Sequence, residues 1–304
     1  MSIHSSLDNF KIIKTLGKGC SGKVKLALNI HDNQLYALKI AFGSPAKQMS
    51  SLKALVREKM MSDFLEHQGV NRVLSVCSEG IYISKSSKGE RNCCYAVTEY
   101  LSRGDFFDFL TKAHHLDENT ARYFFTQMID LVEHLHAKNI GHRDIKAENF
   151  MLDSEFGVKL IDFGFSTTMD PSKPNTTRLG TVPYMAPEIQ YGLAYNADKS
   201  DIFSLGVILF MMIHGHLPFS EATENDPHYK LFVTNPKGFW AYHAKVKAKI
   251  SVSDSAKQLL TAMFCINPHK RITLDQIKRS RWINESVDKD TAIRNASIVF
   301  LNSF

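Results

Sequence analysis

The chain has 304 residues, of which 44% are hydrophobic and 22% charged, a composition that excludes a disordered or fibrous protein. Its 37 Lys and Arg against 31 Asp and Glu give a net charge of +6, but no block of like charges concentrates this excess, so we expect no nucleic-acid partner. The longest apolar run, residues 202–213, is too short to cross a bilayer. We therefore expect no membrane span, and a helix there that is buried on all sides.

The cysteines and the N-terminus indicate a reducing compartment. The five cysteines are odd in number and show no C-x-x-C spacing, so reduced thiols are expected and not a disulfide framework or a zinc site. Residues 1–9 are polar with no apolar signal core, and Ser2 stands where N-myristoylation requires glycine. We expect a cytoplasmic protein, with entry into the nucleus left open.

The first hundred residues carry the alternation of strands, with one helical stretch at 51–66 where apolar residues recur at helical spacing. A turn at His31, Asp32 and Asn33 and a polar loop at 84–92 separate some of the strands. Strands are expected at residues 10–14, 24–28, 36–40, 82–83 and 95–98.

After Tyr100 the pattern becomes helical. Asp117 can cap a helix that runs to about residue 137, and a strand at 157–161 leads into Asp162. Segment 221–249 is expected to be a packed loop in preference to a docking surface, and 284–304 is too short for another domain. Further helices are expected at 202–213, 229–232, 255–264 and 274–283.

The most specific signal is the octapeptide at 142–149, His-Arg-Asp-Ile-Lys-Ala-Glu-Asn, followed by Asp-Phe-Gly at 162–164. Two acidic groups and an amide in such loops suit phosphoryl transfer from a metal-bound nucleotide, whereas a polar turn between two strands would not need this order. The strings resemble the catalytic loop and metal-binding loop of eukaryotic protein kinases. The resemblance implies that Asp144 orients the substrate hydroxyl, Lys146 neutralises the transferred phosphoryl group, and Asn149 and Asp162 hold Mg²⁺.

Three glycines, Gly17, Gly19 and Gly22, lie between two expected strands, where they would let backbone N–H groups approach phosphates. A strand and not a helix follows them, which disfavours a dinucleotide-binding fold. The motif resembles the kinase Gly-rich loop, with Ser21 in place of the usual aromatic residue. Tyr-Ala-Leu-Lys at 36–39 resembles the strand whose lysine holds the α- and β-phosphates.

The kinase resemblance supplies the remaining ATP contacts. Glu58 follows Lys39 by 19 residues, the family separation between this lysine and its helix partner. Ser62 stands where relatives keep a larger apolar residue. Other residues implied to contact ATP are Val24, Ala37, Thr98, Glu99, Leu101, Asp105 and Met151.

The resemblance also favours a Ser/Thr kinase. Lys146 is typical of that type, and Thr181 resembles the hydroxyl residue that contacts the catalytic Asp and Lys and the substrate. Ala-Pro-Glu at 186–188 resembles the end of the activation segment, with Arg271 as the implied ion-pair partner of Glu188, and Asp201 the residue that ties down the catalytic loop. The closest group is that of the calcium/calmodulin-dependent and AMP-activated kinases.

The resemblance covers residues 10 to 282 and implies an α+β, two-lobed protein kinase fold. The expected division is an extension at 1–9, an N-terminal lobe at 10–98, a hinge at 99–104, a C-terminal lobe at 105–283 and a tail at 284–304. The implied function is transfer of the γ-phosphoryl of ATP, with Mg²⁺, to Ser or Thr of a protein or peptide substrate. A pseudokinase scaffold and a small-molecule kinase are the alternatives, against which stand the complete motif set and the Ala-Pro-Glu segment.

Substrate preference and regulation follow from the same resemblance. Glu148 and Asp105 resemble the acidic residues that select Arg three positions before the acceptor. Thr177 lies eleven residues before Glu188, where relatives carry the activating phosphothreonine, although the adjacent Thr176 is an alternative. A phosphate there would pair with Arg143 and order the loop, which implies an upstream activating kinase.

Overall fold

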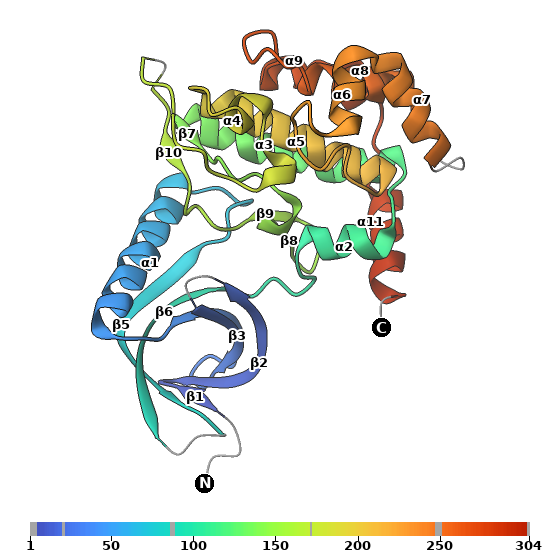
Figure 1. The fold of residues 1–304 in the computed structure, drawn as a ribbon. Helices are drawn as coiled ribbons and strands as arrows, with labels where there is room; N and C mark the ends of the chain where they lie inside the picture. The colour runs from blue at the N-terminus through green and yellow to red at the C-terminus, as the bar shows by residue number, and fades with distance from the viewer. Residues whose placement is uncertain (1–4, 20–21, 86–88, 171, 247–250, 303–304) are drawn as a thin grey trace. The chain divides into compact units, whose positions relative to one another are not determined.

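The computed structural model describes residues 5–19, 22–85, 89–170, 172–246 and 251–302, so Cys20 and Ser21 of the glycine turn lie outside it. The chain forms two compact units, Met1–Ser102 with Ile161–Gly164, and Arg103–Leu160 with Phe165–Phe304. The first unit is mainly β-sheet with one helix, and the second is mainly helical (Figure 1). The expected α+β fold is thereby confirmed.

The sheet of the first unit closes on itself. Its strands follow the order β1-β2-β3-β4-β6-β5, and β1 pairs antiparallel with both β2 and β5. The expected strands are present but longer, because cross-strand hydrogen bonds continue beyond the segments that alternate in polarity. The two-residue β1 is too short to show any pattern in the sequence. The strands are β1 (Ser6–Leu7), β2 (Phe10–Gly19), β3 (Gly22–Asn29), β4 (Leu35–Ala41), β5 (Val73–Ile83) and β6 (Glu90–Glu99).

Successive residues of β4 and β6 serve the two faces of this sheet, as the period of two in a strand requires. One face fills the interior of the closed sheet, with Leu38 and Ile40 of β4 beside Tyr95 and Val97 of β6. The opposite face packs against helix α1 (Pro45–Leu65) through a separate cluster: Ala41, Leu55, Val73, Cys94 and Ala96. A single strand pair therefore holds both cores of the unit.

Helix α1 starts six residues before the expected 51–66, because Pro45 occupies its first turn, where the missing N–H costs nothing. Ser62 is 1% exposed, accepts from the Val73 amide at 3.2 Å and donates to the Lys59 carbonyl at 2.9 Å. The serine at a position where the family resemblance implies a larger apolar residue therefore bonds α1 to the start of β5.

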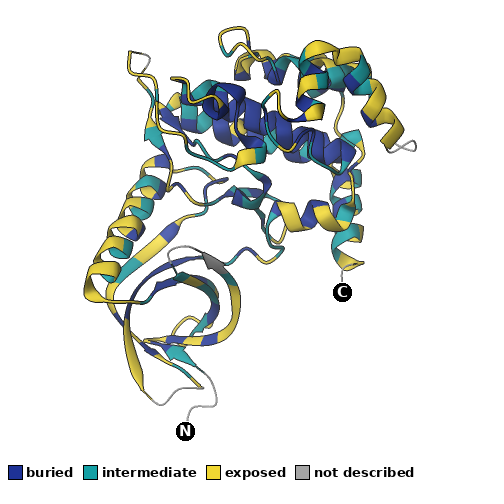
Figure 2. Ribbon diagram, in the orientation of Figure 1, coloured by how far each residue is buried: buried dark blue, intermediate teal, exposed yellow. Residues whose placement is uncertain are grey.

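Helix α5 (Ala197–His214) is the centre of the second unit. Every residue from 202 to 213 is buried, and Figure 2 shows the helix dark blue over nearly all its length. The expectation of an all-round buried helix is confirmed. Gly215 ends α5 with φ 69°, a left-handed conformation that glycine adopts without a Cβ penalty. The helix expected from Asp117 is α3 (Glu118–Ala137), and the Asp117 side chain accepts from the Thr120 amide.

The segment expected to be a packed loop contains two helices, α6 (Pro227–Thr234) and α7 (Pro236–Val246). They pack through Phe232 and Phe239, whose ring centroids are 5.3 Å apart, and the Trp240 indole N–H donates to Thr261 of α8 (Asp254–Met263) at 3.2 Å. The expected packing is therefore present, and the helix expected at 229–232 is α6, whereas α7 is a helix where an irregular loop was expected. Pro227 and Pro236 start the helices and do not interrupt them.

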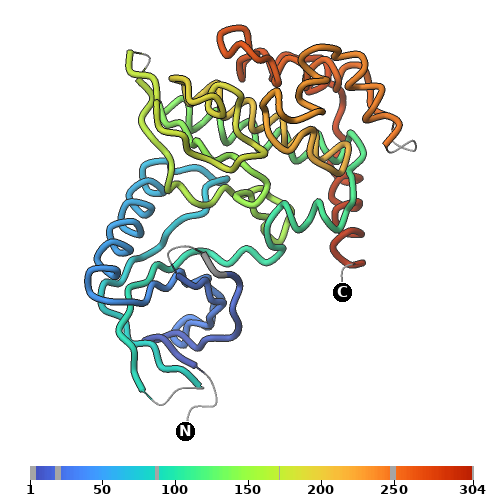
Figure 3. Tube along the Cα trace, in the orientation of Figure 1, coloured from blue at the N-terminus to red at the C-terminus, as the bar shows by residue number. Residues whose placement is uncertain are grey.

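The helix expected at 274–283 is two helices, α9 (Leu274–Lys278) and α10 (Arg281–Asn284), because Ser280 caps the second and breaks the run. The tail forms a helix that no pattern indicated, α11 (Lys289–Leu301), with Asp288 as its cap. In Figure 3 this C-terminal segment runs beside the segment of α2 (Phe106–Ala113).

The four described cysteines form no disulfide, and burial raises the pKa of Cys93 to about 12, so that thiol stays protonated. Among the described residues, no helix has both the length and the apolar character that a bilayer crossing requires.

Candidate active site

One face of the first unit's sheet carries the residues expected around the nucleotide. Val24 of β3 lies opposite Lys39 of β4, and Ala37 lies opposite Thr98 of β6. Directly opposed residues and residues two apart point to the same side of a sheet, so these four share one face. The Thr98 hydroxyl donates to the Ala37 carbonyl at 3.2 Å, which fixes its rotamer.

The lysine of this face has the expected partner. The Lys39 ammonium and the Glu58 carboxylate of α1 form an ion pair with side-chain exposures of 25% and 17%. Partial burial reduces screening by water, so the pair holds the ammonium in one place. The predicted Lys39–Glu58 pair is thus present.

Gly22 requires glycine at the start of β3. Its φ is +155°, and a Cβ there would overlap the Ile40 carbonyl oxygen of β4. Gly17 has open space where a Cβ would lie, so its need for glycine rests on the family resemblance alone.

Asp162 has an unusual backbone for a non-glycine residue, with φ 63°. Such a conformation costs on the order of 1–3 kcal/mol and persists where the surroundings enforce it. The Asp162 side chain accepts from the Gly164 amide at 3.0 Å, which orients the carboxylate.

The catalytic-loop residues of the second unit converge on one hydroxyl. The Thr181 hydroxyl donates to Asp144 Oδ1 and accepts from Lys146 Nζ, both at 2.9 Å. Lys146 Nζ lies 2.8 Å from Asp144 Oδ2, and Asn149 Nδ2 donates to the Asp144 carbonyl at 2.8 Å. A carboxylate, an ammonium and an amide are therefore held together, between the short helix at Ala147–Asn149 and the turn at Val182–Tyr184.

The loop at 142–149 is hydrogen-bonded to α5. Asp201, which is 1% exposed, accepts from the amides of His142 and Arg143, both at 2.9 Å. The expected tie between Asp201 and the catalytic loop is confirmed. His136 of α3 also contacts Asp201, Nε2 to Oδ2, at 2.9 Å, a partner that the sequence did not single out.

The end of the activation segment is fixed by a buried ion pair. Arg271 donates two parallel hydrogen bonds to Glu188 of α4 (Pro187–Gln190), at 2.7 and 2.8 Å, and also donates to the Lys199 and Cys265 carbonyls. Both members are at most 4% exposed, and the Arg271 guanidinium donates four hydrogen bonds. The implied Glu188–Arg271 pair is present.

Residues 10–283 match the family described as protein kinase domain. The chain belongs to the protein kinase family. It is 33% identical over 274 residues to serine/threonine-protein kinase SIK1 of Mus musculus and to that of Rattus norvegicus. The matches cover 90% of this chain but 32% of each relative, so the chain spans about a third of the length of these curated relatives.

In this kinase domain Arg143, the residue before Asp144, already has hydrogen-bond partners. Arg143 Nη1 donates to Asn175 Oδ1 at 3.0 Å, and Nε donates to the Phe165 carbonyl at 2.7 Å. Asn175 exchanges backbone hydrogen bonds with Tyr195 in both directions. A phosphate was expected to pair with Arg143. In the structure a neutral amide, that of Asn175, already accepts from this guanidinium.

The expected phosphosite, Thr177, is exposed. Its carbonyl accepts from the Tyr195 hydroxyl at 3.1 Å. Thr176 is exposed as well. Both threonines are therefore accessible to an enzyme.

The two acids expected to select a basic substrate residue are Asp105 and Glu148. Burial raises the pKa of Asp105, and the charges of Asp108 and, to a smaller extent, Glu148 raise it further. Asp105 caps α2 by accepting from the Asp108 amide at 2.9 Å, and Glu148 accepts from the Tyr184 hydroxyl at 3.1 Å. The Asp105 carboxyl therefore lies among other carboxylates that disfavour its charged form.

The expected Mg²⁺ ligands have suitable chemistry. Both Asn149 and Asp162 offer side-chain oxygens, which Mg²⁺ prefers. Because Asn149 Nδ2 donates to Asp144, the amide carbonyl oxygen is the atom left for a cation.

The structure also places the other residues expected to contact ATP. Met151 lies on β8 (Phe150–Leu152), which pairs with β9 (Val158–Leu160), and it forms a bridge with Asp105. Leu101 is buried, and Glu99 is the last residue of β6.

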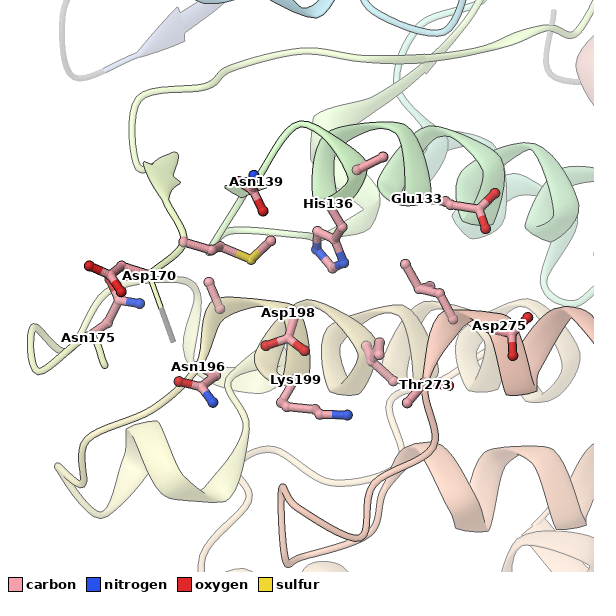
Figure 4. Close-up of a pocket in the computed structure, with 15 residues that line it drawn as sticks. Glu133, His136, Asn139, Asp170, Asn175, Asn196, Asp198, Lys199, Thr273 and Asp275 are labelled. Carbon is pink, nitrogen blue, oxygen red and sulfur yellow. The ribbon is translucent and has the colours of Figure 1, made fainter. Parts of the chain in front are cut away.

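A cavity of about 500 Å³ is lined by residues of α3 and α5 (Figure 4). His136 of α3 and Asn175 both line it, and these residues contact Asp201 and Arg143 respectively. Asp198 and Asn196 at the start of α5 line another wall. Its lining does not include Asp144, Lys146 or Thr181.

Proposed function

We propose that this protein is a Ser/Thr protein kinase that transfers the γ-phosphoryl of ATP to a hydroxyl of a protein substrate. The observation that carries the proposal is the set of contacts joining Asp144, Lys146, Asn149 and Thr181. Asp144 accepts the hydroxyl proton, Lys146 stabilises negative charge, and Thr181 aligns both side chains. Mg²⁺, held by Asn149 and Asp162, would neutralise charge on the phosphates.

The residues of the first unit support ATP as the phosphoryl donor. Lys39, fixed by Glu58, would bind the α- and β-phosphates, and the glycine turn would offer its backbone amides. Val24, Ala37 and Met151 would contact adenine, whose edge would bond to the backbone of Glu99 and Leu101. Lys39→Met is therefore expected to cripple turnover while some nucleotide binding remains.

The deciding experiment is phosphorylation of a degenerate peptide library with ATP and Mg²⁺. Asp144→Asn should lower kcat by about 10²–10⁴-fold with nearly unchanged ATP binding, since its part is confined to the transition state. A scaffold without turnover, the pseudokinase alternative, would show binding of ATP or partners but no labelled peptide. Full kcat in Asp144→Asn would remove the catalytic assignment.

We infer a moderate preference for Arg three residues before the acceptor, from the neighbouring Glu148 and Asp105 carboxylates. Met211 accepts a weak hydrogen bond from the Tyr184 hydroxyl at 3.6 Å and supplies no further charge, so a second Arg should add little. An exposed charge pair is worth about 1 kcal/mol or less, a selectivity of up to roughly fivefold. A library with no basic preference, or with an acidic one, would exclude the idea.

We infer that an upstream kinase phosphorylates Thr177 and raises the activity of an already folded segment. The Asn175–Arg143 contact supports appreciable activity without phosphate, and the phosphate adds charge-assisted bonds to Arg143. Thr177→Ala and phosphatase should each lower activity modestly. Asn175→Ala should lower the activity of unphosphorylated enzyme, and Arg143→Ala should make phosphorylated and unphosphorylated enzyme alike. Unchanged activity in the Thr176→Ala, Thr177→Ala double variant would refute the switch.

A further inference from the structure

Helix α11 lies beyond residue 283, where the match to the kinase family ends, and yet it packs closely on the second unit. Asn295 donates to Asp117 at 3.0 Å and to the Thr120 hydroxyl at 3.3 Å. At its start, Asn119 donates to the Asp288 carbonyl and accepts from the Asp288 amide. Ala292 and Ala296 are fully buried, so small side chains allow close approach to α2 and α3. The tail is therefore a fixed part of this unit.

The last turn of α11 reaches a single arginine. The Arg103 guanidinium lies 4.8 Å from the ring centroid of Phe300 and 3.9 Å from that of Phe156. Its Nε and Nη2 both donate to the Ser154 carbonyl, at 2.9 and 2.8 Å. The planar cation thus contacts two aromatic rings while its edge is hydrogen-bonded, a geometry that lysine could not reproduce.

Arg103 is the first residue of the second unit, and it precedes Asp105 by two positions. Its amide donates to the Leu152 carbonyl at 3.2 Å, and the Leu152 amide donates to the Gly104 carbonyl at 2.9 Å. Asp105 then forms a bridge with Met151. A contact that fixes the Arg103 side chain therefore fixes the backbone that carries Asp105 and Met151.

We propose that α11 is a brace of the kinase domain and that Phe300 is a positioning residue, which acts through Arg103 to hold Asp105 and Met151 for the nucleotide and the basic substrate residue. The proposal rests on the proposed function for its kinetic consequence, but the brace itself is a statement about the stability of residues 103–105 and 150–154. Removing the ring should loosen this segment and weaken substrate binding, while Asp144 and Lys146, which α11 does not contact, keep their chemistry.

The test compares Phe300→Ala and Phe300→Tyr with Leu301→Ala. Leu301 is 69% exposed on the same helical turn and serves as the matched control. Hydrogen exchange should become about two- to fivefold faster at the Leu152 amide and across 103–106 in Phe300→Ala, since a cation–π contact of this kind is worth about 0.5–1 kcal/mol. Phe300→Tyr keeps a ring and should behave like the parent chain, as should Leu301→Ala.

The kinetic readout separates positioning from chemistry. Phe300→Ala should raise KM for ATP and for an Arg-containing peptide by about two- to fivefold, with kcat retained. Faster exchange without any peptide phosphorylation in the parent chain would leave the brace standing and refute the proposed function. Unchanged exchange in Phe300→Ala, or a truncation after Val287 that raises kcat/KM, would overturn the brace; the second result would make α11 a brake.

Discussion

Single side chains set the local geometry of this kinase domain, and Thr181 is an example. Its hydroxyl donates to the Asp144 carboxylate and accepts from the Lys146 ammonium. One oxygen atom therefore sets the distance between these two charged groups. Threonine and serine alone among the standard aliphatic side chains combine both roles at this length. The Asp144 carboxylate is therefore positioned by the hydroxyl of a neighbouring loop.

We expect Thr181→Val, which keeps the shape and removes both hydrogen bonds, to lower kcat by about ten- to a hundredfold, since a hydrogen bond to a charged group contributes roughly 1.5–3 kcal/mol. Thr181→Ser keeps the hydroxyl and should retain most of the activity. Steady-state kinetics on one peptide, with ATP saturating, measure the difference. Equal activities in the two variants would show that the hydroxyl is not needed.

The raised pKa of Asp105 predicts a pH-dependent substrate preference. Burial disfavours the charged carboxylate, and the charges of Asp108 and, to a smaller extent, Glu148 add to the effect, so Asp105 takes up a proton at a higher pH than an ordinary aspartate. The ratio of kcat/KM for a peptide with Arg three positions before the acceptor to that for its Ala counterpart should therefore fall as the pH is lowered. Asp108→Asn should move this fall to lower pH, because the larger of the two charge contributions to the raised pKa is removed. A ratio that is flat with pH would contradict the role of these acids.

At the scale of helices and strands, polar side chains in apolar surroundings fix how the elements join. Ser62 binds the Val73 amide and thereby connects α1 to β5. His243 of α7 is buried, and its ring packs against Phe210 of α5 and His228 of α6. Neither residue takes part in the chemistry. Each side chain affects the stability of a contact between elements, and a pattern of apolar positions in the sequence does not reveal that contact.

Ser62→Ala should destabilise the first unit by about 1–3 kcal/mol, because the buried Val73 amide loses its acceptor. Met60→Ala, at a position on the same helix that is 67% exposed, should change stability by less than about 0.5 kcal/mol. Thermal unfolding and hydrogen exchange of the Val73 amide measure both. Slow exchange at Val73 in Ser62→Ala would contradict this account.

The buried His243 predicts loss of stability in acid. Burial lowers its pKa from the ordinary 6.5 to about 3, helped by the facing histidines 214, 216 and 228, and neither ring nitrogen has a hydrogen-bond partner among the described residues. The folded chain therefore keeps the ring neutral, while the unfolded chain gains a proton below pH 6.5, so this contribution to stability is lost as pH falls from 6.5 toward 3.

His243→Phe should make the melting temperature less dependent on pH in that interval and should not destabilise the protein at neutral pH, since the imidazole leaves its polar atoms unsatisfied. His269→Phe, in a loop after α8, provides the comparison for loss of any one histidine. Parallel pH profiles for His243→Phe and the parent chain would show that this ring does not control acid stability.

At the scale of the whole molecule, contacts between residues far apart in sequence hold the kinase domain together. Glu188 and Arg271 are 83 positions apart and form a buried pair with two hydrogen bonds. Glu188→Gln should cost about 3–5 kcal/mol, because Arg271 keeps its buried charge without a counter-ion. Glu133→Gln removes an exposed pair with Lys278 and should cost at most about 1 kcal/mol. Denaturant unfolding of the two variants measures the contrast, and similar losses would argue against it.

The sequence by itself determined the class of fold and the family, because these depend on residue order within short segments. The octapeptide at 142–149, the alternation in β3 and β4, the Asp117 cap and the apolar run of α5 each act over a few positions along the chain. Spacing was informative even at a distance where a motif fixed both ends, as for Lys39 with Glu58 and for Glu188 with Arg271.

Only the tertiary structure decided the contacts between segments that carry no shared pattern. Asn175 accepts from Arg143, Ser62 accepts from the Val73 amide, and the Phe300 ring lies against the Arg103 guanidinium, each by a side chain that looks ordinary in sequence. Helices α7 and α11 likewise form because they bury Phe239, Ala292 and Ala296 against other helices, and their own propensity does not require it. Burial and hydrogen bonding depend on which groups meet in space, and that is settled by the folded chain.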